Sequence, residues 1–126
     1  MIDMAKKEIL PAAAKYIKDI AKTAELAKSC GAETVFEEET VKEISALVTE
    51  MYKALGTLEA DVQKVHSIED TQEMANFFHD TIFADMGALR VPADKIETLV
   101  GKEYWPYPTY SDLLFYVCLL YTSDAA

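Results

Sequence analysis

The sequence has few residues that interrupt helices and few that bind polyanions. Only four Gly and four Pro occur among its 126 residues, so long stretches are free of helix breakers. Twelve Lys and Arg stand against 22 Asp and Glu, which gives a net charge of −10. Because contacts to phosphate groups need clustered basic side chains, we expect no nucleic-acid partner.

Cysteines and long apolar runs are also scarce. Cys30 and Cys118 lie too far apart in the sequence to suggest a disulfide framework, which favours a cytoplasmic setting. No apolar run approaches the ~18–20 residues that cross a bilayer, so we expect no membrane partner. The composition is nevertheless 51% hydrophobic, which a disordered acidic tail would not be. A chain of this length is expected to form one domain with a single hydrophobic core.

Hydrophobic periodicity predicts three long helices, over residues 3–29, 34–66 and 68–100. The second has the strictest spacing, with apolar side chains that alternate by three and four positions: Val41, Ile44, Val48, Met51, Leu55, Leu58, Val62 and Val65. No strand-like run and no internal repeat accompanies these patterns. We therefore predict an all-α fold, an antiparallel three-helix bundle with an extended aromatic C-terminal segment.

The predicted helix ends follow from capping residues. Gly31 is a natural stop for the first helix, because glycine adopts the left-handed conformation at little cost. Thr34 and Glu37 have the spacing of a capping box at the start of the second helix. Ser67 and Asp70 can cap the third helix after a short turn.

Two prolines and two further apolar stripes complete the helical pattern. Pro11 predicts a kink in the first helix or a separate short helix before it, and Pro92 predicts a kink or break near residues 90–92. The first stripe is Ile9, Ala13, Tyr16, Ile20, Ala24 and Ala27. The third stripe is Ala75, Phe78, Ile82, Met86, Leu89, Ala93, Ile96 and Val100.

Residues 102–117 form a segment of a different kind. Six of the thirteen aromatic residues fall between positions 104 and 116, and the interspersed prolines prevent a helix. Such a segment can be a proline-rich ligand for a partner's aromatic groove, or it can pack on its own helices or on an adjoining domain. We favour packing and expect the following packing or assembly anchors: Trp105, Pro106, Tyr107, Pro108, Tyr110, Leu113 and Phe115.

The candidates for chemistry are weak. His66 has Glu69 and Glu73 at helical spacing, which suits a metal site, but a di-metal bundle needs Glu-x-x-His on two helices. Gln63 and Asn76 occupy the glutamate positions before the two histidines, so that motif fails twice. The adjacent residues Glu37, Glu38 and Glu39 point in different directions on a helix, and Cys30 has no activating neighbour in sequence. We expect no catalytic, cofactor-binding or metal-binding residue.

Two stretches resemble a known enzyme family. Residues 2–21 read IDMAKKEILPAAAKYIKDIA, and residues 96–115 read IETLVGKEYWPYPTYSDLLF. Both resemble the C-terminal region of glutamine synthetase type III, a large bacterial glutamate–ammonia ligase, over about residues 1–117. The run YWPYPTYSDLLF is the specific part. Ser111 stands where we expect Gly, and Pro92 where a helix former is usual.

The resemblance implies an activity for the parent enzyme and a structural or assembly role for this part. The family makes glutamine from glutamate, ammonia and ATP in ring-shaped homo-oligomers, with Mg²⁺ or Mn²⁺ held on a catalytic domain. None of the family's metal or nucleotide ligands matches a position in this chain, so the fragment alone is expected to be non-catalytic and to bind no cofactor. The implied partners are the catalytic domain of the same chain and neighbouring subunits.

Residues 118–126, CLLYTSDAA, stand apart from that pattern. They resemble the translation of a transposon end and adaptor used to fragment DNA for sequencing, so we expect a non-native tail after a helical domain of residues 1–117. A stand-alone acidic helical module that recruits a partner helix is the alternative from another functional class. An in-frame catalytic domain encoded upstream, or a stop codon before Met1, distinguishes the two.

Overall fold

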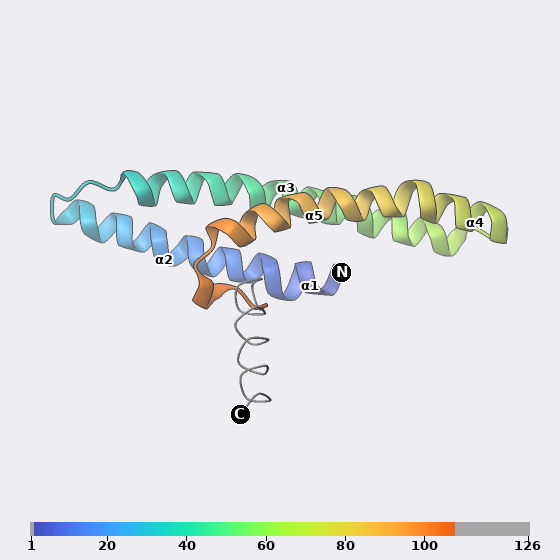
Figure 1. The fold of residues 1–126 in the computed structure, drawn as a ribbon, viewed down its shortest axis with the longest axis horizontal. Helices are drawn as coiled ribbons and strands as arrows, with labels where there is room; N and C mark the ends of the chain where they lie inside the picture. Colours follow the sequence, from blue (N-terminus) through green and yellow to red (C-terminus); the bar gives the residue numbers. More distant parts are fainter. Residues whose placement is uncertain (1, 108–126) are drawn as a thin grey trace, which may run out of the picture.

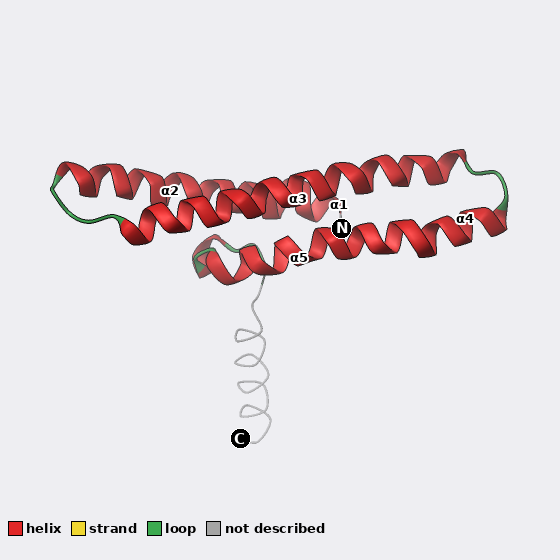
Figure 2. Ribbon diagram, turned by 90° about the horizontal axis from the view of Figure 1, so that it is seen from above, coloured by secondary structure: helices red, strands yellow, loops and turns green. Residues whose placement is uncertain are grey.

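The computed structural model describes residues 2–107, and every regular element among them is helical. Figures 1 and 2 show three long segments joined by two short loops. The helices are α1 (Ile2–Met4), η1 (Ala5–Ile9), α2 (Leu10–Ser29), α3 (Val35–Ser67), α4 (Thr71–Phe77), η2 (Phe78–Ile82), α5 (Phe83–Leu99) and η3 (Lys102–Tyr104). The predicted all-α class is confirmed, and the three long segments lie close to the predicted ranges.

The two loops lie at opposite ends of α3. The chain reverses direction after α2 and again before α4, so the first and third segments each run back along α3 (Figure 2). α3 contacts both α2 and α5. The buried core draws on all three segments: Ala5, Ile9, Ala13, Ile44, Leu47, Met51, Leu55, Leu58, Ile82, Leu89, Ile96 and Val100. No helix among residues 2–107 has the length and apolar character required to span a membrane.

Pro11 is accommodated by a π-helical turn. The segment Ala5–Ile9 is π-helical, and the Leu10 N–H bonds to the carbonyl of Ala5, five residues back. A proline ring clashes with the carbonyl four residues before it, and a widened turn relieves that crowding. The first segment therefore stays continuous from Ile2 to Ser29, with a change of helix type where the sequence predicted a kink or a separate short helix.

The loop between the first two segments is built around Gly31 and Thr34. Gly31 has φ of +78°, so the predicted left-handed stop is confirmed. Thr34 precedes α3 as predicted, but its side chain does not cap the helix, so the predicted capping box is wrong. The Thr34 hydroxyl instead donates to Glu38 Oε1 at 3.2 Å, and Glu38 forms an ion pair with Lys28 from α2. The Lys28 ammonium lowers the pKa of the Glu38 carboxyl.

The third segment begins at Asp70, whose carboxylate accepts a hydrogen bond from the Gln72 N–H at 2.8 Å. Asp70 is therefore the predicted cap. Ser67 is not, because it is the last residue of α3 and its hydroxyl donates to the Lys64 carbonyl at 2.7 Å. Pro92 lies inside α5 without ending the helix, so of the kink or break predicted near residues 90–92 the break is wrong. Its ring is fully buried, and these apolar contacts offset the missing N–H.

A second π-turn corrects the predicted apolar stripe. η2 spans Phe78–Ile82, and the Phe83 N–H bonds to the Phe78 carbonyl, five residues back. Because the turn holds one extra residue, the residues before it that face the core are displaced by one position in the sequence. Phe77 consequently packs against the core, whereas Phe78, which the periodicity placed there, is 53% exposed. The remaining predicted positions from Ile82 to Val100 are buried or half-buried.

Candidate functional site

The aromatic segment turns back over the first helical segment directly after Gly101. The Tyr104 ring packs on the Tyr16 ring, with the ring centres 5.1 Å apart and the planes tilted by 59°. The Tyr104 hydroxyl donates to Asp19 Oδ2 at 2.7 Å. A side chain at Gly101 would meet both rings, with its Cβ 3.2 Å from Tyr16 Cε2 and 3.3 Å from Tyr104 Cδ2. Glycine thus allows the close approach of η3 to α2.

Trp105 and Tyr107 extend the contact between the aromatic segment and the first helical segment toward the N-terminal end of that segment. Both are half-buried and pack against the core, and their rings meet edge to face with centres 6.2 Å apart. The Tyr107 hydroxyl donates to Glu8 on η1. Pro106 between them is exposed. The other predicted anchors lie outside the described residues, as does the tail 118–126: Pro108, Tyr110, Leu113 and Phe115.

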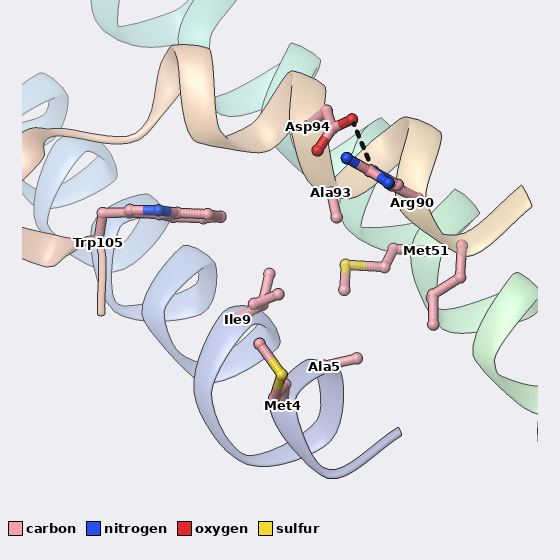
Figure 3. A pocket seen from close by; sticks show the side chains of 9 residues that line it. Met4, Ala5, Ile9, Met51, Arg90, Ala93, Asp94 and Trp105 are labelled. Atoms are coloured by element: carbon pink, nitrogen blue, oxygen red, sulfur yellow. Dashed lines mark ion pairs between the residues drawn. The ribbon is translucent and has the colours of Figure 1, made fainter. Parts of the chain in front are cut away.

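An apolar hollow opens beside Trp105, which we call the Trp105 groove. It measures about 410 Å³, and its walls come from α1, η1, α3, α5 and the aromatic segment. Its apolar lining includes Met4, Ile9, Met51, Leu89, Ala93 and Trp105. Arg90 and Asp94 lie at one side and pair with each other, with 3.6 Å between Arg90 Nε and Asp94 Oδ2 (Figure 3).

Sequence reasoning missed part of this arrangement. Tyr104 belongs to the aromatic run but was not among the expected anchors, although it makes both a ring contact and a hydrogen bond. Asp19 and Glu8, which receive the tyrosine hydroxyl groups, carry no signal in the sequence that separates them from other surface acids. Their role depends on the turn at Gly101, which brings residues 85 and 99 positions apart into contact.

The pKa of Tyr104 is raised above 10.0. The main cause is the hydrogen bond to the Asp19 carboxylate, followed by removal of the hydroxyl from water and by the negative charge of Asp19. Each of these favours the protonated phenol over the phenolate.

Two carboxyl groups, those of Asp61 on α3 and Asp85 on α5, interact where these helices meet. The hydrogen bond to Asp61 raises the pKa of Asp85, with burial and the charge of Asp61 adding to it and the Lys64 ammonium opposing it. The Asp85 Oδ2 is buried and has no hydrogen-bond donor among the described residues. A proton held between the two carboxyl groups would supply one, which agrees with the direction of the pKa shift.

The other sequence candidates do not come together. Within residues 2–107 no three His, Cys, Asp or Glu side chains are close enough to hold a metal ion. His66, Glu69 and Glu73 are exposed, and His79 pairs with the neighbouring Asp80 on the surface. Cys30 is a free, exposed thiol.

Two curated proteins match nearly the whole chain. The glutamine synthetase of Butyrivibrio fibrisolvens is 33% identical over 117 residues, which cover 91% of this chain and 17% of that protein. The glutamine synthetase of Bacteroides fragilis (strain YCH46) is 27% identical and covers 90% of this chain, but only 16% of its own length is matched. This chain is similar to part of glutamine synthetase. The resemblance to glutamine synthetase expected from the sequence is thereby confirmed.

The chain spans about a sixth of the length of the glutamine synthetases that it matches. No family model matches it, and no solved structure does. Similarity to glutamine synthetase thus rests on sequence along about nine-tenths of the chain.

Proposed function

We propose that this chain is the C-terminal helical region of a type III glutamine synthetase and that it serves structure and assembly. The observation that carries the proposal is the extent of the matches: about nine-tenths of this chain aligns with about a sixth of each glutamine synthetase. A stretch of this length has the usual size of one domain in a larger enzyme. It would comprise residues 1–117, followed by a non-native tail.

The architecture that we propose for this domain is an antiparallel three-helix bundle closed by the aromatic segment. Support comes from the two chain reversals at opposite ends of α3 and from the core that all three segments share (Figures 1 and 2). Short connections of this kind favour antiparallel neighbours. The aromatic segment would hold the bundle to the catalytic body or to a neighbouring subunit of a ring-shaped homo-oligomer in the cytoplasm.

The chemistry of the parent would reside outside this domain. Glutamine synthesis from glutamate, ammonia and ATP with Mg²⁺ or Mn²⁺ needs convergent polar and charged groups. The Trp105 groove has mainly apolar walls, and its two charged residues pair with each other. The described residues that line it therefore offer no polar group free to orient a nucleotide or an amino acid.

A stand-alone interaction module is the second candidate, because several large apolar side chains are exposed on the helices. Leu26 is 63% exposed, Phe36 65% and Phe83 69%. Such side chains fit a partner surface whether the partner is the rest of the same enzyme or another protein. The reading frame upstream of Met1 decides between the two.

The test uses the full enzyme that carries this stretch. Trp105→Ala should lower thermal stability and the fraction assembled into rings, measured by differential scanning fluorimetry and light scattering. Because Trp105 is half-buried, we expect a cost of about 2–3 kcal/mol, below the ~3–5 kcal/mol of a fully buried tryptophan. Tyr52→Ala, which truncates an exposed aromatic side chain on α3, is the matched control.

Assembly and stability equal to those of the Tyr52→Ala enzyme would refute the structural role of the aromatic segment. A separate assay tests the absence of chemistry. The isolated chain should form no glutamine from glutamate, ammonia and ATP, and turnover above that of a mock preparation would overturn the proposal.

A further inference from the structure

We propose that Asp61 and Asp85 form a clasp that holds the third helical segment on α3 while their carboxyl groups share a proton, and that loosens when both are ionised. The proposal goes beyond the proposed function, because it concerns a conformational change within this chain. It can hold or fail in this chain whatever the parent enzyme does.

Both aspartates occupy helix positions that face the apolar contact between α3 and the third segment. Asp85 lies three residues after Ile82 and four before Leu89, and each of these two residues is only 2% exposed. Asp61 lies three residues after Leu58, which is also 2% exposed, and the Asp61 side chain itself is 13% exposed. Residues three and four positions apart lie on the same face of a helix. The two carboxyl groups therefore meet beside a hydrophobic contact.

The hydrogen bonds at this contact leave one oxygen atom without a donor. Asp85 Oδ2 is buried and has no partner among the described residues. A buried acceptor without a donor costs free energy, whereas a shared proton would turn one carboxyl group into a donor for the other. The pKa of Asp85 is raised accordingly, first by the hydrogen bond to Asp61 and then by burial and by the charge of Asp61.

The charges that act on Asp85 come from α3. Lys64 Nζ lies 3.4 Å from Asp61 Oδ1, and this ammonium group opposes the rise in the pKa of Asp85. From the first segment, Asp3 lines a hollow together with Met86, but it is not among the groups that shift this pKa. Ionisation of both aspartates therefore brings two negative charges together with one ammonium group, on a side chain that is 67% exposed, to offset them.

The clasp lies where the third segment depends mainly on α3. Figures 1 and 2 show α4 at the end of the molecule away from α2. The opposite end of the third segment leads into the aromatic segment, which Tyr104 and Tyr107 hold to the first segment. Repulsion between the two aspartates would therefore loosen α4, η2 and the start of α5 while α2 stays packed on α3. Regions with few tertiary contacts open locally at a low cost in free energy.

The first test follows amide hydrogen exchange in the full chain from acid to neutral pH, with protection expressed relative to the unstructured chain at each pH. Protection of residues 78–89 should fall relative to α2 as the pH rises above 3.8 and through the pKa of Asp85 in the folded protein. We expect a fall of about threefold, because solvent screens a partly exposed pair.

Two asparagine variants show whether this fall belongs to the clasp. Asp85→Asn, whose amide can donate to Asp61 at every pH, should remove the fall. Asp94→Asn is the matched control, because its carboxylate on the same helix is 65% exposed, and it should retain the fall. A fall that persists in Asp85→Asn, or that is equally large in α2, would overturn the proposal.

A lysine variant tests the direction of the electrostatic effect with both aspartates in place. Lys64→Gln removes the ammonium group that opposes the shared proton, so the fall in protection should move to higher pH. Lys42→Gln is the matched control, because Lys42 on the same helix also pairs with an acid three residues before it, Glu39, and it should leave the fall in place. No movement in Lys64→Gln, or equal movement in both variants, would overturn the assignment of the fall to Asp61 and Asp85.

Discussion

The π-turn η2 makes a sharp prediction for two adjacent phenylalanines. Counting back from the buried Ile82, an α-helix would place Phe78 on the same face, whereas a turn with one extra residue places Phe77 there. The structure buries most of Phe77 and leaves Phe78 53% exposed. Phe77→Ala and Phe78→Ala therefore remove the same atoms from neighbouring positions with different surroundings.

The expected costs follow from how much of each ring leaves water on folding. Truncating a fully buried phenylalanine to alanine costs ~3–5 kcal/mol. Phe77 is partly buried, so we expect Phe77→Ala to lower the free energy of unfolding by about 2–3 kcal/mol. Phe78 keeps just over half of its surface in water, which reduces the expected cost to about 1 kcal/mol. The gain in helix propensity on introducing alanine is common to both and cancels in the comparison.

The assay is urea unfolding followed by far-ultraviolet circular dichroism, with the slope of the transition as a check on two-state behaviour. Phe83→Ala, at a ring that is 69% exposed, provides a third reference and should cost less than Phe77→Ala. A larger loss for Phe78→Ala than for Phe77→Ala would show that the segment continues as a regular α-helix, and the proposed register would be wrong.

Three further predictions concern a glycine pair and two titrating groups. Gly31→Ala should destabilise the protein by about 1 kcal/mol because φ is positive there, whereas Gly56→Ala, in open space inside a helix, should stabilise it by a similar amount in the same urea assay. Because the pKa of Asp85 is raised in the folded protein, this group contributes stability below pH 3.8. That contribution is lost as the pH rises through the pKa that Asp85 has in the folded protein. Asp85→Asn, whose amide can donate to Asp61, should therefore raise the free energy of unfolding at neutral pH by less than about 1 kcal/mol, with a smaller effect in acid. Tyr104→Phe should lower the melting temperature at neutral pH, and the difference should close as the pH rises above 10.0 and through the raised pKa of the phenol.

The sequence predicted most of the helical pattern because burial in a helix repeats at fixed intervals. Ile44, Met51, Leu55 and Leu58 lie on the predicted stripe and are almost completely buried. Leu47 is also buried, although the strict alternation favoured Val48, which remains half-exposed. A helix that contacts neighbours on two sides buries a wider face than a narrow seam, so a stripe defined by one spacing omits some core positions.

The site was harder to anticipate than the helices. Trp105 and Tyr107 were expected to pack, but the acidic partners of the tyrosines could not be chosen from the sequence, because many similar carboxylates lie on the same helices. The two π-turns have no periodic signature of their own, and only the first is explained by a nearby proline, Pro11. Both features depend on contacts between segments distant in the chain.

The end of the described chain stabilises its beginning, and this has a consequence for the groove. Tyr104 and Tyr107 bind Asp19 and Glu8, so the aromatic segment is held to the first helical segment by two contacts that each close a loop of most of the chain. Closing such a loop costs entropy, which is offset only once the intervening segments have packed. The Trp105 groove has walls from the first segment, α3, α5 and Trp105 itself, so no subset of these elements can form it. The groove should therefore appear only with the complete helical core.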